Sequence, residues 1–257
     1  MNKALFKEDI KRFWPLSAAA FLLYFLFGPF DLLSGNGSTS YQILSMLSNN
    51  NAGFLVLECM FPVVICTAVF QYQFKGNSNG VIHAMPFTKK ELFLTGTASA
   101  CALSAAPQVL TALTFALMRV LDLAVLRSGS EAAADFYSRI WSLSGFGLWL
   151  LTAAVISFYC LCICIFAAMI SGTAVMSLLN GMMLNGLATV LFTVRTYFYG
   201  VYMTGWCSDD AGYRFTHPAV YYRQEARSLL SGEGNRLLAF AGSVLAFTAV
   251  ALLIIAA

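Results

Sequence analysis

Long apolar runs constrain this chain more than any other feature of its sequence. They lie near residues 15–33, 52–72, 92–117, 143–170, 173–199 and 237–257. A helix needs about 20 residues to cross a bilayer core of about 30 Å, because it rises about 1.5 Å per residue. Each run is long enough for one crossing. The sequence therefore predicts an all-α integral membrane protein, a single multi-pass domain over residues 1–257 with about six transmembrane helices.

The charge content supports this interpretation. Only 11% of the 257 residues are charged, whereas a typical soluble domain carries about 25%. The net charge of +3 is small. We therefore expect membrane lipids around the chain and no nucleic-acid partner. Only Ser171 and Gly172 separate the fourth run from the fifth, which predicts a tight helical hairpin.

The first 13 residues alternate charged and bulky side chains. On a helix, Leu5, Phe6 and Ile10 gather on one side, opposite a basic face. Such a segment lies flat in the membrane interface, so residues 1–13 are predicted to form an interfacial elbow helix. Pro15 suits the first turn of a new helix and is expected to begin the first span.

The lysines predict the orientation. All of them fall in the N-terminal segment and in the loop after the second span: Lys3, Lys7, Lys11, Lys75, Lys89 and Lys90. Two crossings separate these segments, which places them on the same side of the membrane. Because basic residues are retained in the cytoplasm, we expect a cytoplasmic N-terminus.

Cysteines and histidines give no metal-ligand pattern in the sequence. On a helix, Cys162 points about 200° away from Cys160, and no His or acidic residue lies nearby in the chain. His83 and His217 fall on opposite sides of the predicted topology, so they are expected to be local hydrogen-bonding residues. We therefore expect the membrane cysteines to be packing residues, with no metal site and no cofactor.

The loop before the third span has a defined local structure. Thr88 followed by Glu91 is a capping-box pattern, which predicts a helix beginning at Thr88. Pro86 disfavours helix at Met85. These residues predict an ordered knob that presents apolar side chains to a partner, although a simple topology-setting loop fits them equally.

The same loop resembles a known family. An apolar pair precedes His83-Ala84-Met85-Pro86-Phe87-Thr88-Lys89-Lys90-Glu91-Leu92, between the second and third spans. This pattern is similar to the first cytoplasmic loop of ABC-2 type transporter permeases of bacteria, particularly Gram-positive ones. In that family an interfacial elbow helix precedes six spans, and the loop helps to dock a separate ATP-binding subunit. The resemblance implies an ABC-2 type exporter fold in the bacterial cell membrane.

The resemblance also implies a role and partners. The chain would be a permease that couples ATP hydrolysis on an ABC ATP-binding subunit to substrate movement, with export favoured over import. The coupling surface would be residues His83, Met85, Pro86, Phe87, Thr88, Lys89, Lys90, Glu91 and Leu92. A second permease subunit, identical or related, would complete a homodimer or heterodimer. Family members usually continue with a basic flank after the sixth span, so we expect a fragment of a longer chain.

The chain is not expected to be an enzyme. No Gly-x-x-x-x-Gly-Lys-Ser/Thr phosphate loop occurs, so ATP hydrolysis would belong to the partner. An intramembrane enzyme is one alternative, but neither His-Glu-x-x-His, Gly-x-Ser-x-Gly nor paired intramembrane aspartates occur. A membrane scaffold or immunity-type protein without transport is a second alternative. The segment 200–234 fits a surface loop or, as the resemblance implies, short re-entrant helices at an outer gate.

Apart from Asp31 at the end of the first span, two charged residues lie inside predicted spans. Glu58 is about six residues below the outer end of the second span, and Arg195 lies slightly shallower in the fifth. We expect them to pair or to line one polar vestibule. A neutral Glu58 and an Arg195 that extends to the interface fit the sequence equally well.

Overall fold

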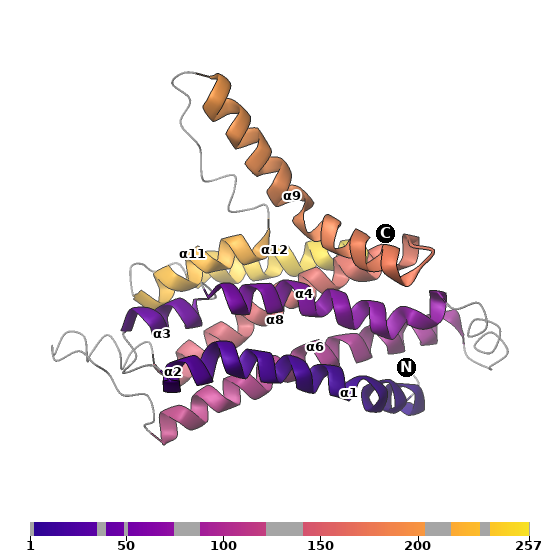
Figure 1. Cartoon of the computed structure of the whole chain (residues 1–257), viewed down its shortest axis with the longest axis horizontal. Coiled ribbons are helices and arrows are strands. Elements are labelled where there is room, and N and C mark those ends of the chain that lie inside the picture. The colour runs from indigo at the N-terminus through magenta and orange to yellow at the C-terminus, as the bar shows by residue number, and fades with distance from the viewer. Residues whose placement is uncertain are drawn as a thin grey trace.

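The computed structural model describes residues 3–34, 40–48, 51–74, 88–121, 141–203, 217–231 and 237–256. Every regular element within these ranges is helical, and Figure 1 shows most of the helices running side by side in one bundle. The α-helices are α1 (Lys3–Phe25), α2 (Asp31–Ser34), α3 (Ser40–Leu47), α4 (Ala52–Val69), α6 (Lys89–Val120), α8 (Leu143–Ile170), α9 (Ala174–Tyr202), α11 (Pro218–Ser231) and α12 (Leu237–Ala256). A π-helical turn covers Leu26–Phe30, and a 3-10 turn covers Phe70–Phe74.

Five helical segments are long and apolar enough to cross a membrane. They are Lys3–Ser34, Gly53–Phe74, Lys89–Val120, Leu143–Ile170 and Ala174–Tyr202. They correspond to the first five predicted spans. The sixth predicted span, near 237–257, coincides with α12, in which Phe240–Ile254 forms a shorter apolar helix. The described part of the chain is thus all-helical, with several helices of the membrane-spanning type.

The N-terminal helix differs from the expectation. We expected a separate elbow over residues 1–13 and a new helix at Pro15, but α1 continues through Pro15 to Phe25. Proline removes only one backbone hydrogen bond from a helix, and packing can offset that loss. Just beyond it, the buried Ser17 Oγ donates a hydrogen bond to the carbonyl oxygen of Leu103 on α6, at 3.1 Å. The close packing of α1 against α6 therefore holds both halves of α1 in one helix.

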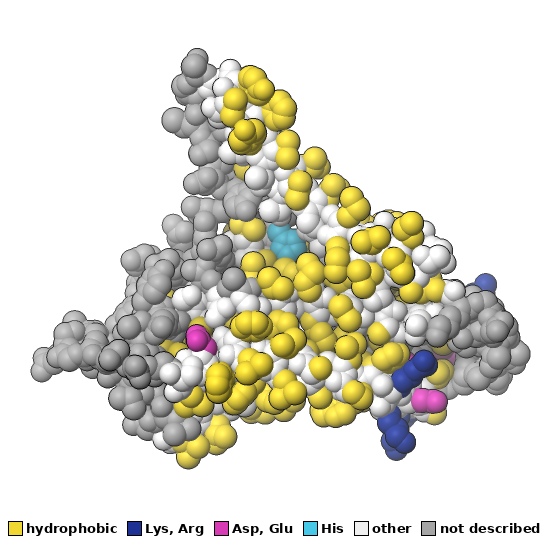
Figure 2. All heavy atoms as spheres, in the orientation of Figure 1, with side chains coloured by type: hydrophobic (Ala, Val, Ile, Leu, Met, Phe, Trp, Pro, Cys, Tyr) yellow, Lys and Arg dark blue, Asp and Glu magenta, His cyan; other side chains and the backbone are white. Residues whose placement is uncertain are grey.

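Hydrogen bonds between helices define their directions. Ser99 Oγ on α6 bonds Asp9 Oδ2 on α1 at 3.2 Å, and the Ser17–Leu103 bond lies further along both helices. The two helices are therefore parallel, and they begin at the same end of the bundle. Figure 2 shows Lys and Arg side chains gathered at this end, beside a broad apolar surface. The starts of α1 and α6, which carry lysines, thus lie at the same end of the bundle, as the two predicted spans between them require.

Aromatic side chains fill the opposite half of the bundle. The ring of Phe54 on α4 lies 5.8 Å from that of Tyr24, 6.3 Å from Phe115 and 5.5 Å from Trp149, measured between centroids. Trp141 packs edge-on against Phe115 at 6.0 Å. Because α1, α4, α6 and α8 each contribute to this cluster, it fixes their relative rotation about their axes.

The predicted hairpin between α8 and α9 is confirmed. α8 ends at Ile170, and the hydroxyl of Thr173 caps α9 by accepting a hydrogen bond from the Met176 amide at 3.3 Å. The first half of α9 packs on the bundle through Ser177, Gly181 and Asn185. Its second half projects away from the other helices, as Figure 1 shows.

Candidate functional site

A buried polar band crosses the middle of the apolar bundle. Gln108 on α6 donates from Nε2 to Ser157 Oγ on α8 at 2.5 Å and to the carbonyl oxygen of Ala153 at 3.4 Å. Ser157 Oγ in turn donates to the carbonyl oxygen of Glu58 on α4 at 3.3 Å. Buried polar groups within membrane helices are costly and often functional, so this band is the first candidate site.

Glu58 joins this band only through its backbone carbonyl oxygen. Its side chain is fully buried, and neither carboxyl oxygen has a hydrogen-bond partner among the described residues. Arg195 is exposed on the projecting half of α9, where its guanidinium lies over the rings of Phe192 and Tyr199, at 5.7 and 5.4 Å. The structure therefore does not bring Glu58 and Arg195 together, because α9 leaves the bundle before Arg195.

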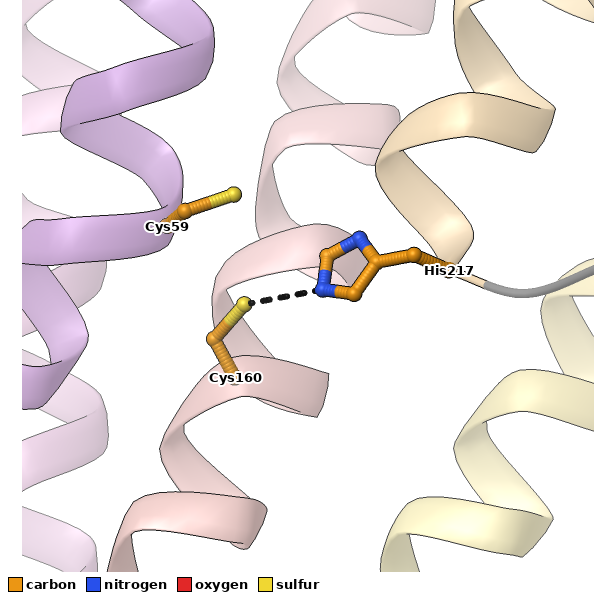
Figure 3. A group of neighbouring side chains, drawn as sticks. All are labelled: Cys59, Cys160 and His217. Carbon is orange, nitrogen blue, oxygen red and sulfur yellow. Dashed lines mark hydrogen bonds between the residues drawn. The ribbon is translucent and has the colours of Figure 1, made fainter. Parts of the chain in front are cut away.

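Beside Glu58, three potential metal ligands converge. Cys59 follows it on α4, Cys160 lies on α8, and His217 directly precedes α11. Their ligand atoms all lie within 4.8 Å of one another, and Cys160 Sγ is 3.7 Å from His217 Nε2. Figure 3 shows these three side chains pointing into one space between the helices. Cys160 is fully buried, His217 is 6% exposed, and Cys59 is partly buried.

The imidazole of His217 also begins a helix. Its Nδ1 accepts a hydrogen bond from the Ala219 amide at 3.1 Å, so the side chain caps α11. In the neutral ring this bond places the proton on Nε2, which faces the sulfur of Cys160. Burial lowers the pKa of His217 to about 4, so the ring is neutral at pH 7.

The placement of α11 corrects the expectation for His217. In the predicted topology, His217 belonged to an outer segment remote from the membrane cysteines. Instead α11 starts beside Cys160, well within α8, and packs against α8 through the buried residues Ala219, Tyr221 and Tyr222. A short helix that begins inside the bundle is compatible with the re-entrant arrangement that the resemblance implied for segment 200–234.

No family model, curated protein or solved structure matches this chain. Inference about its function therefore depends on its own residues.

The predicted coupling surface is described in part. Thr88 Oγ1 accepts from the Glu91 amide at 3.2 Å, and Glu91 Oε2 accepts from the Thr88 amide at 3.3 Å. This confirms the capping box and the start of a helix there. Lys89 and Lys90 are exposed on the first turn of α6, and Leu92 is half-buried. The remaining members of the predicted surface, His83, Met85, Pro86 and Phe87, lie outside the described residues.

The convergence of Cys59, Cys160 and His217 was not predicted from the sequence. Along α8, the spacing does point Cys162 away from Cys160, as the sequence indicated. Cys164, one turn further along α8, instead accepts a hydrogen bond from Asn185 Nδ2 on α9 at 3.4 Å. The only sequence signal for the cluster is a cysteine in each of two spans and one histidine in a later segment, which does not by itself indicate that the three meet.

Proposed function

We propose that this chain is the permease subunit of an ATP-driven transporter of the ABC-2 type in the bacterial cell membrane. A separate ATP-binding subunit would hydrolyse ATP, and the helices described above would carry the substrate, in the direction of export. The N-terminus would be cytoplasmic, and a second permease chain would complete the transporter.

One observation carries this proposal. The capped start of α6, with exposed Lys89 and Lys90, lies at the same end of the bundle as the charged start of α1. These are the two segments that form the docking side in the permeases that the chain resembles. Because both hydrogen bonds of the capping box are formed, the first turn of α6 is well ordered, and a partner can transmit force through it.

α6 provides a physical route from that end to the polar band. It is continuous for 32 residues, which corresponds to about 48 Å of helix. Gln108, whose side chain reaches Ser157 and Ala153 on α8, lies on this same helix. A displacement at Lys89 and Lys90 is thus transmitted to the centre of the bundle without crossing a loop.

The test is co-purification of the full chain with the ATP-binding subunits encoded beside its gene. A Lys89→Glu, Lys90→Glu variant reverses two charges at the proposed docking end. Arg119→Glu is the control, because Arg119 is exposed at the opposite end of the same helix. We expect the wild type and the control to retain an ATPase subunit and the double variant to lose it.

Two other results would contradict this proposal or its docking surface. If the wild-type chain recruits no ATP-binding subunit, the transporter proposal fails, and the scaffold or immunity-type interpretation replaces it. If both charge variants lose the subunit equally, the docking surface does not lie at the start of α6.

A further inference from the structure

We propose that Cys59, Cys160 and His217 form a binding site for a zinc ion within the helical bundle. The three residues come from different elements, α4, α8 and the start of α11, and their side chains converge on one point (Figure 3). The inference is independent of the transporter proposal, because it uses only the chemistry and geometry of these side chains.

The distances fit tetrahedral coordination. Zinc bonds thiolate sulfur at about 2.3 Å and imidazole nitrogen at about 2.0 Å, so a tetrahedral site separates the two donors by about 3.6 Å. Cys160 Sγ and His217 Nε2 are 3.7 Å apart. Cys59 Sγ lies within 4.8 Å of both, whereas a zinc site separates two sulfurs by about 3.8 Å. A small rotation of the Cys59 side chain is therefore sufficient to complete three corners of the tetrahedron.

The donor set selects the metal. Thiolate and imidazole ligands suit zinc and copper(I), and exclude magnesium and calcium, which prefer oxygen. Two thiolates and a neutral imidazole balance the charge of Zn²⁺, whereas they leave an anion around Cu⁺. Because an uncompensated charge is costly to bury among apolar helices, the neutral zinc complex is favoured.

Proton release accompanies binding. Each thiol loses one proton to solvent, and the proton on His217 Nε2 moves to Nδ1, so that Nε2 becomes the ligand. The ring then no longer accepts from the Ala219 amide, so one neutral hydrogen bond is exchanged for a coordination bond. The N-terminus of α11, a helix of 14 residues, lies beside Cys160, and its partial positive charge favours the thiolate.

The arrangement leaves one coordination position open. Three protein ligands and a fourth position for water are typical of zinc sites that bind or transform a further molecule, whereas structural zinc sites are closed by four ligands. The site also lies next to the buried Glu58, which directly precedes Cys59 on α4. A zinc ion at this site would link α11 to α4 and α8. Its fourth coordination position would face the interior of the bundle.

The test uses the full chain, purified in detergent under reducing conditions and stripped of metal with a chelator. Co²⁺ is the probe, because a tetrahedral cobalt–thiolate complex gives intense visible bands and a sulfur-to-cobalt charge-transfer band. We expect one Co²⁺ per chain with both signatures, displaced stoichiometrically by Zn²⁺. Cys59→Ser, Cys160→Ser and His217→Asn should each weaken binding more than about tenfold, since losing even an outer-shell partner commonly costs about 10- to 100-fold.

Two variants act as matched controls. Cys101→Ser removes a partly buried thiol on α6 that is outside the cluster, and it should bind as the wild type does. His217→Asn removes the ligand but retains an oxygen that can cap α11, so a loss of binding in this variant reports coordination rather than a lost helix cap.

A second measurement uses only the wild-type chain, so it does not depend on whether a variant folds. Saturating Zn²⁺ should protect Cys59 and Cys160 of the wild-type chain from alkylation, but not Cys101, as read by mass spectrometry. The proposal is overturned if the wild type shows no cobalt–thiolate bands, if it binds no more tightly than the three ligand variants, or if Zn²⁺ protects all three thiols equally. Recovery of a Cys59–Cys160 disulfide from protein kept reduced would also overturn it.

Discussion

The ring of Phe54 lies directly against the backbone at Gly28, within the π-helical turn that follows α1. A Cβ atom at position 28 would overlap Phe54 Cζ and would come within 3.1 Å of Phe115 Cζ. Phe54 has little freedom to move, because Tyr24, Phe115 and Trp149 surround it. Only a glycine therefore allows this turn to approach α4 so closely.

We expect Gly28→Ala to lower the stability of the bundle by about 1–3 kcal/mol, the usual range for overpacking a filled core. Gly186→Ala on α9 is the control, because a Cβ atom at that position would have no neighbouring described atom within 4 Å. That change should be neutral or slightly stabilising, since alanine favours helix over glycine. Thermal unfolding in detergent measures both, and equal effects would contradict the contact.

The aromatic cluster should be sensitive to removal of its central ring. Phe115 is fully buried and packs against Trp141, Phe146 and Trp149, so Phe115→Ala leaves a cavity and costs about 3–5 kcal/mol. Leu113→Ala, on the exposed face of the same helix, should cost much less. Denaturation by sodium dodecyl sulfate from mild detergent would give the comparison.

Loss of the capping box is expected to destabilise only the first turn of α6. Thr88→Ala removes the acceptor for the Glu91 amide and should destabilise the first turn of α6 by about 1 kcal/mol. Lys90→Ala, on the same exposed turn, leaves both capping bonds intact. Hydrogen exchange of the amides near Glu91 should accelerate in the first variant and not in the second.

Substitution of Glu58 is expected to raise the stability of the bundle, whereas the substitutions above lower it. The buried carboxyl of Glu58 has no hydrogen-bond partner among the described side chains, so Glu58→Leu removes an unsatisfied polar group and should raise stability by about 1–3 kcal/mol. If Glu58 formed the ion pair with Arg195, the same substitution would lower stability instead. A gain in unfolding temperature together with a loss of transport would identify Glu58 as a residue retained for function.

His217 predicts a pH dependence in the metal-free chain. Its pKa is about 4 in the fold because of burial and about 6.5 in the unfolded chain, so the unfolded state binds more protons between these values. Stability should therefore fall by up to about 3 kcal/mol as the pH decreases from 6.5 to 4. His217→Asn cannot titrate and should flatten this part of the profile. An unchanged slope would show that His217 is not buried in the neutral form.

Local properties of the chain predicted much of the fold. The apolar lengths near 143–170 and 173–199 correspond closely to α8 and α9, because the length needed to cross a bilayer is independent of neighbouring helices. The capping box at Thr88 was equally predictable, since both of its partners lie within one helical turn. The continuity of α1 through Pro15 was not, because packing against α6 outweighs the one backbone bond that proline removes.

The sequence by itself thus determined that the chain is helical and apolar, where its long helices lie, and which end of the bundle carries the lysines. Tertiary structure alone decided that Cys59, Cys160 and His217 meet while Glu58 and Arg195 do not. Those outcomes depend on how each helix is rotated about its axis and on where α9 leaves the bundle. Both are set by contacts between residues far apart in the chain, such as Gly28 with Phe54 and Gln108 with Ser157, which no local pattern records.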